Sequence, residues 1–259
     1  MIKENTLEKN MNTSLIQKDN IKKLFAFDES QKHIVIGTDE AGRGPAAGGV
    51  FAAAVCFTKK NNDLIEKLHI LNDSKKLSKK NREALYDIIR ENSLNAVFCI
   101  EVEEIEKINI LNASLKAMRL ACLDVLNQLS VEVNSKMLFG FFKNQAVNNE
   151  TGKSVKENST ITLVDGNKKI KEYPYSQRCV IKGDSNSAAI AAASILAKVT
   201  RDRYMEKLDT EYPQYRWAKN AGYLTKEHIA AIDTYGLSPY HRPSFLEKHF
   251  SKQEQLQLF

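Results

Sequence analysis

The chain has 259 residues, 42% of them hydrophobic, and a formal net charge of +6. A chain of this length can bury enough surface to fold without a disulfide or a structural metal. Its cysteines are far apart and form no C-x-x-C pair, which excludes a zinc ribbon or a thioredoxin-type motif. Its apolar runs are shorter than the roughly 20 residues of a membrane span, and its N-terminus lacks the apolar block of a secretory signal. We therefore expect a cytoplasmic protein with no membrane contact, and the basic charge weakly favours nucleic acid as a partner.

The first elements are expected after a polar N-terminal stretch. Residues 1–30 are rich in Lys, Asn and Glu, and we expect a mobile extension with only a short helix near 21–27. A folded unit over residues 31–250 then begins with two apolar, strand-like runs at 33–39 and 49–57. Such near-continuous apolar strands are typical of a sheet that is covered on both faces.

Helices and strands then alternate along the rest of the chain. We expect a helix over 79–91, capped by Ser78, a strand over 96–102 and an amphipathic helix over 111–129. Residues 139–159 are polar and predict an insertion loop. Strands are expected at 160–164 and 179–181, followed by an Ala-rich helix to about residue 208, a small C-terminal helical part and a tail over 251–259. This order predicts the α/β class.

Acidic residues stand where these strands end. Asp39 and Glu40 close the first strand, Asp165 closes the fourth, and Asp184 follows the fifth. Carboxylates at the carboxyl ends of strands project into the crevice where open α/β sheets bind ligands. Clustered carboxylates need a cation, and hard ions such as Mg²⁺ or Mn²⁺ prefer oxygen ligands. Taken singly, each acid is better explained as a turn residue or, for Asp184, as a helix cap, so only assembly by a sheet would make a site.

Several sequence blocks, in order along residues 33–250, resemble the ribonuclease HII family. The first is Gly37-Thr-Asp-Glu-Ala-Gly-Arg-Gly-Pro45. It is followed by Asp73-Ser-Lys-Lys-Leu77, Val164-Asp-Gly-Asn167, Lys182-Gly-Asp-Ser185, Ala192-Ala-Ser-Ile-Leu-Ala-Lys-Val-Thr-Arg-Asp202, Gly222-Tyr-x-Thr-x-x-His228 and His241-Arg-Pro-Ser-Phe245. One departure is Asn186-Ser-Ala-Ala, which replaces the family's usual Val-Pro-Glu type of segment.

The resemblance implies an RNase H-like fold, a five-stranded mixed sheet flanked by helices. It implies that Asp39, Glu40, Asp165 and Asp184 are the catalytic acids and the ligands of Mg²⁺ or Mn²⁺. Asp184 is expected to complete a second ion site when the substrate phosphate arrives. Asp202, in contrast, is expected to pair with a neighbouring base.

The same resemblance implies residues that read the substrate. The block Gly42-Arg43-Gly44 would contact the 2′-hydroxyl and the adjacent phosphate, consistent with the close backbone approach that glycine permits and with the preference of arginine for phosphate. Tyr223 would stack on the deoxyribose that follows the ribonucleotide. Further substrate contacts are expected from Ser74, Lys75, Lys182, Ser185 and Arg242, although lysines in general are solvated surface groups.

The last five residues resemble the peptide by which bacterial proteins bind the sliding clamp. In Gln255-Leu256-Gln257-Leu258-Phe259, Leu and Phe would enter an apolar pocket while Gln255 fixes the register. The alternative is a chain end that packs on the domain.

The implied activity is endonucleolytic hydrolysis of the RNA strand of RNA–DNA hybrids, and of DNA 5′ of a single embedded ribonucleotide. A metal-activated water would leave 3′-hydroxyl and 5′-phosphate ends, by a monomeric enzyme of ribonucleotide repair and DNA replication. One alternative is an RNase H-like DNA nuclease or transposase, which a DNA-only duplex would reveal. The other is a non-catalytic hybrid-binding module, which metal-dependent cleavage would exclude. Ribonuclease HIII would not be expected to carry the Gly-Arg-Gly block.

Overall fold

A five-stranded mixed sheet forms the centre of the protein. The computed structural model describes residues 17–141, 159–247 and 249–251. The strands are β1 (Ile34–Ala41), β2 (Val50–Cys56), β3 (Leu94–Ile100), β4 (Thr160–Asp165) and β5 (Gln177–Val180), in the spatial order β3-β2-β1-β4-β5. β1, β2 and β3 pair antiparallel, whereas β4 and β5 continue the sheet parallel to β1. The expected mixed sheet of five strands is confirmed.

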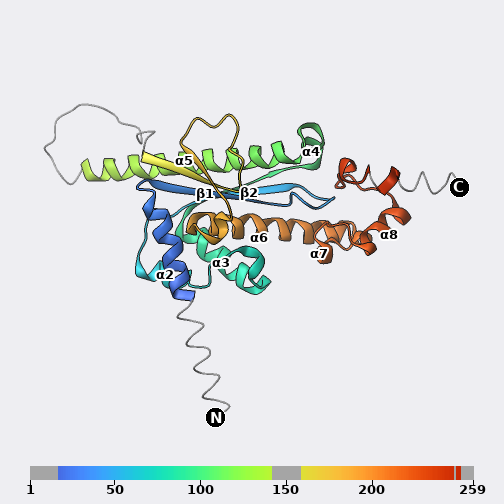
Figure 1. The fold of residues 1–259 in the computed structure, drawn as a ribbon, viewed down its shortest axis with the longest axis horizontal. Coiled ribbons are helices and arrows are strands. Elements are labelled where there is room, and N and C mark those ends of the chain that lie inside the picture. The colour runs from blue at the N-terminus through green and yellow to red at the C-terminus, as the bar shows by residue number, and fades with distance from the viewer. Residues whose placement is uncertain (1–16, 142–158, 248, 252–259) are drawn as a thin grey trace, which may run out of the picture.

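Long helices cover both faces of the sheet. α5 (Ile110–Phe141) lies on one face and α6 (Ala188–Glu211) on the other (Figure 1). Every residue of β2 is buried, as expected for a strand between two helical layers. One core cluster therefore forms between the sheet and α5, and another between the sheet and α6.

The contact between α6 and β1 is unusually close. A Cβ atom added to Gly37 in β1 would lie 2.3 Å from the backbone of Ala189 and Ile190. Glycine at this position and alanines along the first turns of α6 let the helix start against the middle of β1. The segment before α6, which carries Asp184, is thereby brought to the carboxyl end of β1.

The N-terminal helix, residues 17–30, packs beneath the sheet (Figure 1). Its residues Ile21, Leu24 and Phe25 belong to the core on the α6 side. The expectation of a mobile extension over residues 1–30 was therefore wrong for residues 17–30, while residues 1–16 lie outside the described part. Apolar residues at helical spacing stabilise this helix by burial against the domain rather than by local propensity.

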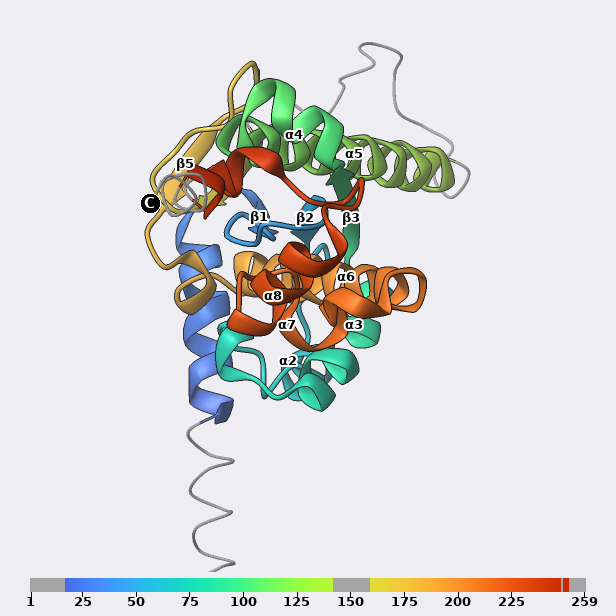
Figure 2. The ribbon, with the colours of Figure 1, turned by 90° about the vertical axis from the view of Figure 1, so that its right-hand side faces the viewer.

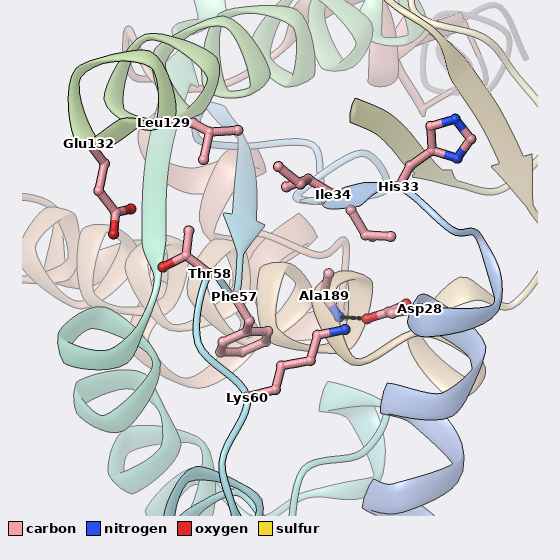
Figure 3. A pocket seen from close by; sticks show the side chains of 10 residues that line it. Asp28, His33, Ile34, Phe57, Thr58, Lys60, Leu129, Glu132 and Ala189 are labelled. Carbon is pink, nitrogen blue, oxygen red and sulfur yellow. Dashed lines mark hydrogen bonds between the residues drawn. The ribbon is translucent and has the colours of Figure 1, made fainter. Parts of the chain in front are cut away.

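Asp28 fastens the N-terminal helix to the start of α6. One of its carboxylate oxygens, Oδ2, accepts a hydrogen bond of 3.0 Å from the Ala189 backbone N–H (Figure 3). The other oxygen, Oδ1, is buried and has no hydrogen-bond partner among the described residues. Burial raises the pKa of Asp28 to about 6. This carboxylate borders a cavity of about 300 Å³ near the beginning of β1, away from the acids at its other end.

The remaining helices differ in part from the sequence expectations. α3 (Lys79–Asn92) begins after Ser78, whose hydroxyl accepts from the Asn81 N–H, as predicted. α2 (Asn62–Lys67) and α4 (Val102–Ile108) were not predicted, and α4 begins where the third strand had been expected to continue. α5 is longer than the expected 111–129 and includes residues 139–141 of the predicted insertion loop. Residues 142–158 of that loop lie outside the described part.

The C-terminal elements pack at the end of the sheet that carries the acids (Figure 2). They include α7 (Trp217–Asn220), α8 (Lys226–Tyr235) and the 3-10 turn η5 (Pro243–Phe245). Their core joins Trp217 and Tyr215 to Ala46 and Ala47, which lie between β1 and β2. In the described part of the chain, none of the helices is long and apolar enough to cross a membrane.

Candidate active site

The two central parallel strands place two of the predicted acids side by side. Thr38 of β1 is in register with Val164 of β4, so the next residues, Asp39 and Asp165, stand at the same edge of the sheet. Asp39 is 8% exposed, and its Oδ1 accepts a hydrogen bond of 2.7 Å from the Glu40 N–H. The side chain of Glu40 is also largely buried.

Asp184 reaches this edge through the turn before α6. Asp165 Oδ1 accepts a hydrogen bond of 2.7 Å from the backbone N–H of Gly183, which ties the end of β4 to the 3-10 turn η3 (Gly183–Ser185). A Cβ atom at Gly183 would lie 2.5 Å from Ile190 and 3.0 Å from the same carboxylate oxygen. Glycine at this position therefore permits the close approach that sets Asp184 beside Asp165.

Burial and neighbouring carboxylates raise the pKa of three of the acids. Burial, followed by the charges of Glu40 and Asp165, raises the pKa of Asp39 well above its usual range. Burial also raises the pKa of Glu40, although Arg43 opposes this shift. The pKa of Asp184 is raised by burial and by the neighbouring carboxylates of Asp73 and Asp165. These directions describe a cluster whose negative charge lacks sufficient compensation from the protein.

The cluster opens into a cavity of about 430 Å³ that also holds most of the predicted substrate readers. Three separate stretches of chain contribute its acids. The residues that line it are Asp39, Glu40, Ala41, Gly42, Arg43, Gly44, Ser74, Lys75, Asp165, Asp184, Ser194, Lys198, Arg201 and Tyr223.

The donor set fits a hard divalent cation. The four acids offer only oxygen atoms, and the pKa values of Asp39, Glu40 and Asp184 are raised by burial and by neighbouring carboxylates, an effect that a bound cation would relieve. Within the described residues, however, no group of three acidic, histidine or cysteine side chains is already close enough together to hold an ion. Side chains that repel one another are expected to separate until a cation draws them in.

Gly42-Arg43-Gly44 forms the wall of the cavity next to Glu40. Gly42 has a φ of +101°, a conformation that side-chain-bearing residues rarely adopt, and a Cβ atom there would lie 2.4 Å from Arg201 Nε. Arg43 Nη1 donates a hydrogen bond of 3.1 Å to Glu40 Oε1 while its side chain remains half exposed. The loop thus presents a partly free guanidinium and an open backbone to the cavity.

Arg201 is a site residue that the sequence analysis did not single out. It is 2% exposed and projects from α6, and its Nη2 donates to the Ala47 and Ala221 carbonyls at 3.4 and 2.9 Å. Arg201 therefore joins the Gly42–Gly44 side of the cavity to the segment that carries Tyr223. A signal existed: Arg201 lies at helical spacing from Ala197, Met205 and Leu208, all of them buried.

Tyr223 lies at the mouth of the cavity with 53% of its surface exposed. It follows Ala221 and Gly222, which both have positive φ angles, of 49° and 79°. Ser74 is buried and Lys75 is exposed, and both also line the cavity. Their neighbour Asp73, which had not been assigned a role, caps the 3-10 turn η1 (Ser74–Lys76) through the Lys75 N–H.

Three of the predicted substrate residues lie outside the cavity lining. The prediction that Arg242 contacts phosphate was wrong, because Arg242 is fully buried. Its guanidinium donates to the Pro45 and Gly48 carbonyls, at 2.8 Å from Nη1 and Nε respectively, and so braces the loop between β1 and β2 from behind. Lys182 is exposed and Ser185 is half buried beside Asp184, but neither lines the cavity. Asp202 pairs with Lys198 at 2.5 Å, as predicted.

Comparisons with known proteins agree with this geometry. The family model described as Ribonuclease HII matches residues 36–252. A protein named Ribonuclease HII from Fusobacterium nucleatum is 46% identical over 234 residues, which cover 90% of this chain and 94% of the relative.

Solved structures share the fold. The ribonuclease HII in the complex with PCNA from Archaeoglobus fulgidus superposes with a TM-score of 0.55 at 22% identity, over 81% of this chain and 93% of that one. The ribonuclease H2 from Pyrococcus horikoshii gives a TM-score of 0.54 at 24% identity, over 81% and 92%. Bst-RNase HIII, solved in complex with Mn²⁺, gives 0.52 at 16% identity, over 79% and 63%. These likenesses support the expected RNase H-like fold.

Proposed function

Because the chain belongs to the ribonuclease HII family, and is therefore a ribonuclease H, we propose that it cuts 5′ of single ribonucleotides in duplex DNA as well as within RNA–DNA hybrids. One observation carries this proposal. A single cavity joins the four acids to the Gly42–Gly44 loop and to Tyr223. The acids supply hydrolytic chemistry, and the loop and the tyrosine supply recognition of a ribose and of the sugar that follows it.

The acids are proposed to hold Mg²⁺ or Mn²⁺. Asp39, Glu40 and Asp165 would provide the first set of oxygen ligands, and Asp184 would join them when the scissile phosphate is present. Bound divalent ions would activate the attacking water and stabilise the leaving oxygen, so that cleavage leaves 3′-hydroxyl and 5′-phosphate ends.

The residues of the chain orient the substrate at this cluster. The Gly42 and Gly44 backbone lets a ribose approach closely, so that its 2′-hydroxyl, which distinguishes RNA from DNA, can be read. Arg43, held 3.1 Å from Glu40 and half exposed, is placed to bind the adjacent phosphate. Tyr223 offers an exposed ring to the next sugar. Lys75 and Lys198, which also line the cavity, bring positive charge to the phosphate backbone.

Lys182 and Ser185 belong to the same proposal at the edge of the site. The backbone of Lys182 is in the left-handed region with a φ of 54°, and its carbonyl accepts from the Ser185 N–H at 3.0 Å. We propose that both side chains meet the substrate strand outside the cavity proper, next to Asp184.

The decisive experiment is cleavage of a duplex that contains one ribonucleotide, mapped to the nucleotide, with and without divalent metal. The expected result is metal-dependent cleavage 5′ of the ribonucleotide and none of a DNA-only duplex. Cleavage of the DNA-only duplex would instead favour an RNase H-like DNA nuclease. Failure to cleave any substrate, with hybrid binding retained, would favour a binding module.

The C-terminal residues Gln255, Leu256, Leu258 and Phe259 are proposed to bind the bacterial sliding clamp. They lie outside the described residues, so the proposal rests on the sequence pattern. The Archaeoglobus structure shows that a ribonuclease HII can form a complex with PCNA. The test compares clamp affinity of the full chain with that of a chain lacking residues 255–259, and equal affinities would refute the proposal.

We also propose that the enzyme acts in the cytoplasm as a monomer, in ribonucleotide repair and DNA replication. All four cysteines are free, as is usual in a reducing compartment. Light scattering of the purified full chain at several concentrations tests the monomer directly.

A further inference from the structure

Two buried histidines contact each other behind the segment that carries Tyr223. His228 of α8 is fully buried and His241 is 2% exposed. Their Nε2 atoms are 3.1 Å apart, and the indole Nε1 of Trp217, itself fully buried, lies 3.1 Å from the same atom of His228. Neither histidine lines the candidate active-site cavity.

The hydrogen-bond partners allow one consistent placement of the protons. His241 Nδ1 accepts from the backbone N–H of Ser238 at 2.9 Å, so the proton of this ring is on Nε2 and is donated to His228. His228 Nε2 accepts one hydrogen bond from His241 Nε2–H and another from the indole N–H of Trp217, because an indole N–H only donates. The proton of His228 is therefore on Nδ1, which donates to the Tyr223 carbonyl at 3.0 Å.

Both rings are neutral in this arrangement. Burial, together with the charge that His228 would carry, lowers the pKa of His241 to about 4, and burial lowers the pKa of His228. A protonated ring would place a donor where the chain needs an acceptor, either at His241 Nδ1 or at His228 Nε2. The directional chain Ser238 to His241 to His228 to Tyr223 is thus fixed over the neutral pH range.

The Tyr223 carbonyl is held from two directions. It also accepts from the Thr225 N–H at 2.8 Å, and the Thr225 hydroxyl oxygen caps α8 by accepting from the His228 N–H at 3.2 Å. The Tyr223 ring is largely exposed, so the direction in which it points depends on its backbone. The backbone of Tyr223 directly follows Ala221 and Gly222, which both have positive φ angles. Such a conformation persists only where neighbouring contacts hold it.

We propose that His228, oriented by His241 and Trp217, is a positioning residue that holds Tyr223 in the direction needed to stack on the sugar after the ribonucleotide. This inference rests on the proposed function, since it assumes that Tyr223 contacts that sugar. It assigns to the buried pair a part in selecting the RNA-to-DNA junction rather than in the hydrolytic step.

Two substitutions at His228 separate the proposed hydrogen bond from the rest of the pair. In His228→Asn, the amide group replaces Nδ1 and can still donate to the Tyr223 carbonyl. In His228→Gln, the amide group lies nearer the former Nε2, so contact with Trp217 is kept and the donor to Tyr223 is lost. On a duplex with one ribonucleotide, we expect kcat/KM to fall about tenfold for His228→Gln, mainly through KM, and no more than about threefold for His228→Asn. Equal losses in both variants, or no loss in His228→Gln, would overturn the proposal.

A double-mutant cycle with Tyr223→Ala distinguishes positioning from a general effect on folding. If His228 acts through Tyr223, adding His228→Gln to Tyr223→Ala should leave kcat/KM unchanged. A further tenfold loss in the double variant would mean that His228 acts by another route. Trp217 is the only tryptophan of the chain, so its emission spectrum reports whether the pair remains packed in each variant. If Tyr223→Ala alone leaves junction cleavage unchanged, the proposed role of Tyr223 fails and the His228 proposal fails with it; if Tyr223→Ala loses activity but the His228 variants do not differ, only the His228 proposal fails.

Discussion

The ring of Tyr223 lies against Gly44, so that a Cβ atom added to Gly44 would stand 3.2 Å from Cε1 of the ring. The two features that the sequence assigns to recognition of successive sugars are thus in contact across the cavity mouth. The absence of a side chain at residue 44 leaves the room that the Tyr223 ring occupies. Under the proposed function, a ligand bound at this contact would touch both.

Substitution of Gly44 by Ala should disturb recognition without disturbing the fold. The Tyr223 ring must move by a few tenths of an ångström, and we expect kcat/KM on a junction substrate to fall about fivefold, ~1 kcal/mol. The free energy of unfolding should change by less than about 0.5 kcal/mol. Gly42→Ala is the contrasting variant, because the new Cβ would collide with Arg201 at a positive φ and should cost about 2 kcal/mol or more of stability. Steady-state kinetics and urea unfolding of both variants check the contrast, and equal stability losses would contradict it.

Substitution of Asp39 by Asn should abolish turnover while making the metal-free protein more stable. We expect cleavage to fall by about a thousandfold or more, ~4 kcal/mol, as one oxygen ligand and its charge are lost. Burial and the neighbouring acids raise the pKa of Asp39, so stability is lost as the pH rises through its folded-state pKa, and Asn avoids that cost. Thermal unfolding in EDTA should show a higher Tm for Asp39→Asn. Added Mg²⁺ or Mn²⁺ should raise the Tm of the wild-type chain more than that of the variant. A wild-type rate in Asp39→Asn would remove this acid from the mechanism.

Asp28, which lies far from the candidate active site, should make the stability of the fold depend on pH. The folded-state pKa of about 6 is above the ordinary aspartate value of 3.8, so the folded chain binds more protons than the unfolded chain between these values. Stability contributed by protonated Asp28 is present below about pH 4 and is lost as the pH rises through 6, by up to about 3 kcal/mol. Asp28→Asn should remove this dependence and raise stability at pH 8, with Ala189 still able to donate to the amide oxygen. Urea unfolding at pH 5 and pH 8 tests this, and a parallel pH dependence in both proteins would refute it.

Arg242 should contribute to stability and not to phosphate binding. Arg242→Met leaves buried carbonyls of Pro45 and Gly48 without their donors, and we expect a loss of about 3–5 kcal/mol. The dependence of hybrid affinity on salt should be unchanged in the folded fraction. Arg43→Met is the matched control, since Arg43 is half exposed: its stability should change little, while the salt slope should fall by about one. A reduced salt slope for Arg242→Met at unchanged Tm would instead support a contact between Arg242 and phosphate.

Much of the sheet and the neighbourhood of the acids could be predicted because the relevant signals are local. The β-branched and apolar runs before Asp39 and Asp165 predict strands, and parallel pairing of these strands brings their ends together. The N-terminal helix was expected only as a short segment near 21–27. Its full length and its packing on the domain were missed because its narrow apolar stripe, Ile21, Leu24 and Phe25, is embedded in lysines and other polar residues.

The roles of the two buried arginines could not be read from composition. A guanidinium is accommodated in a core only where carbonyls surround it, and those carbonyls come from distant segments. Arg242 meets Pro45 and Gly48 across almost 200 residues of sequence. The same limit applies to His228 and His241, because their contacts join α7, α8 and the segment after α8.

The strand order has a consequence for when this protein becomes a nuclease. β1 is made early but pairs with β4 more than 100 residues later, and the loop after β1 is braced by Arg242 near the end of the chain. A ribosome that synthesises the protein from its N-terminus has therefore completed most of it before the acids can meet. Until β4 has been made, the nascent chain lacks the assembled cluster of acids that is proposed to carry out hydrolysis.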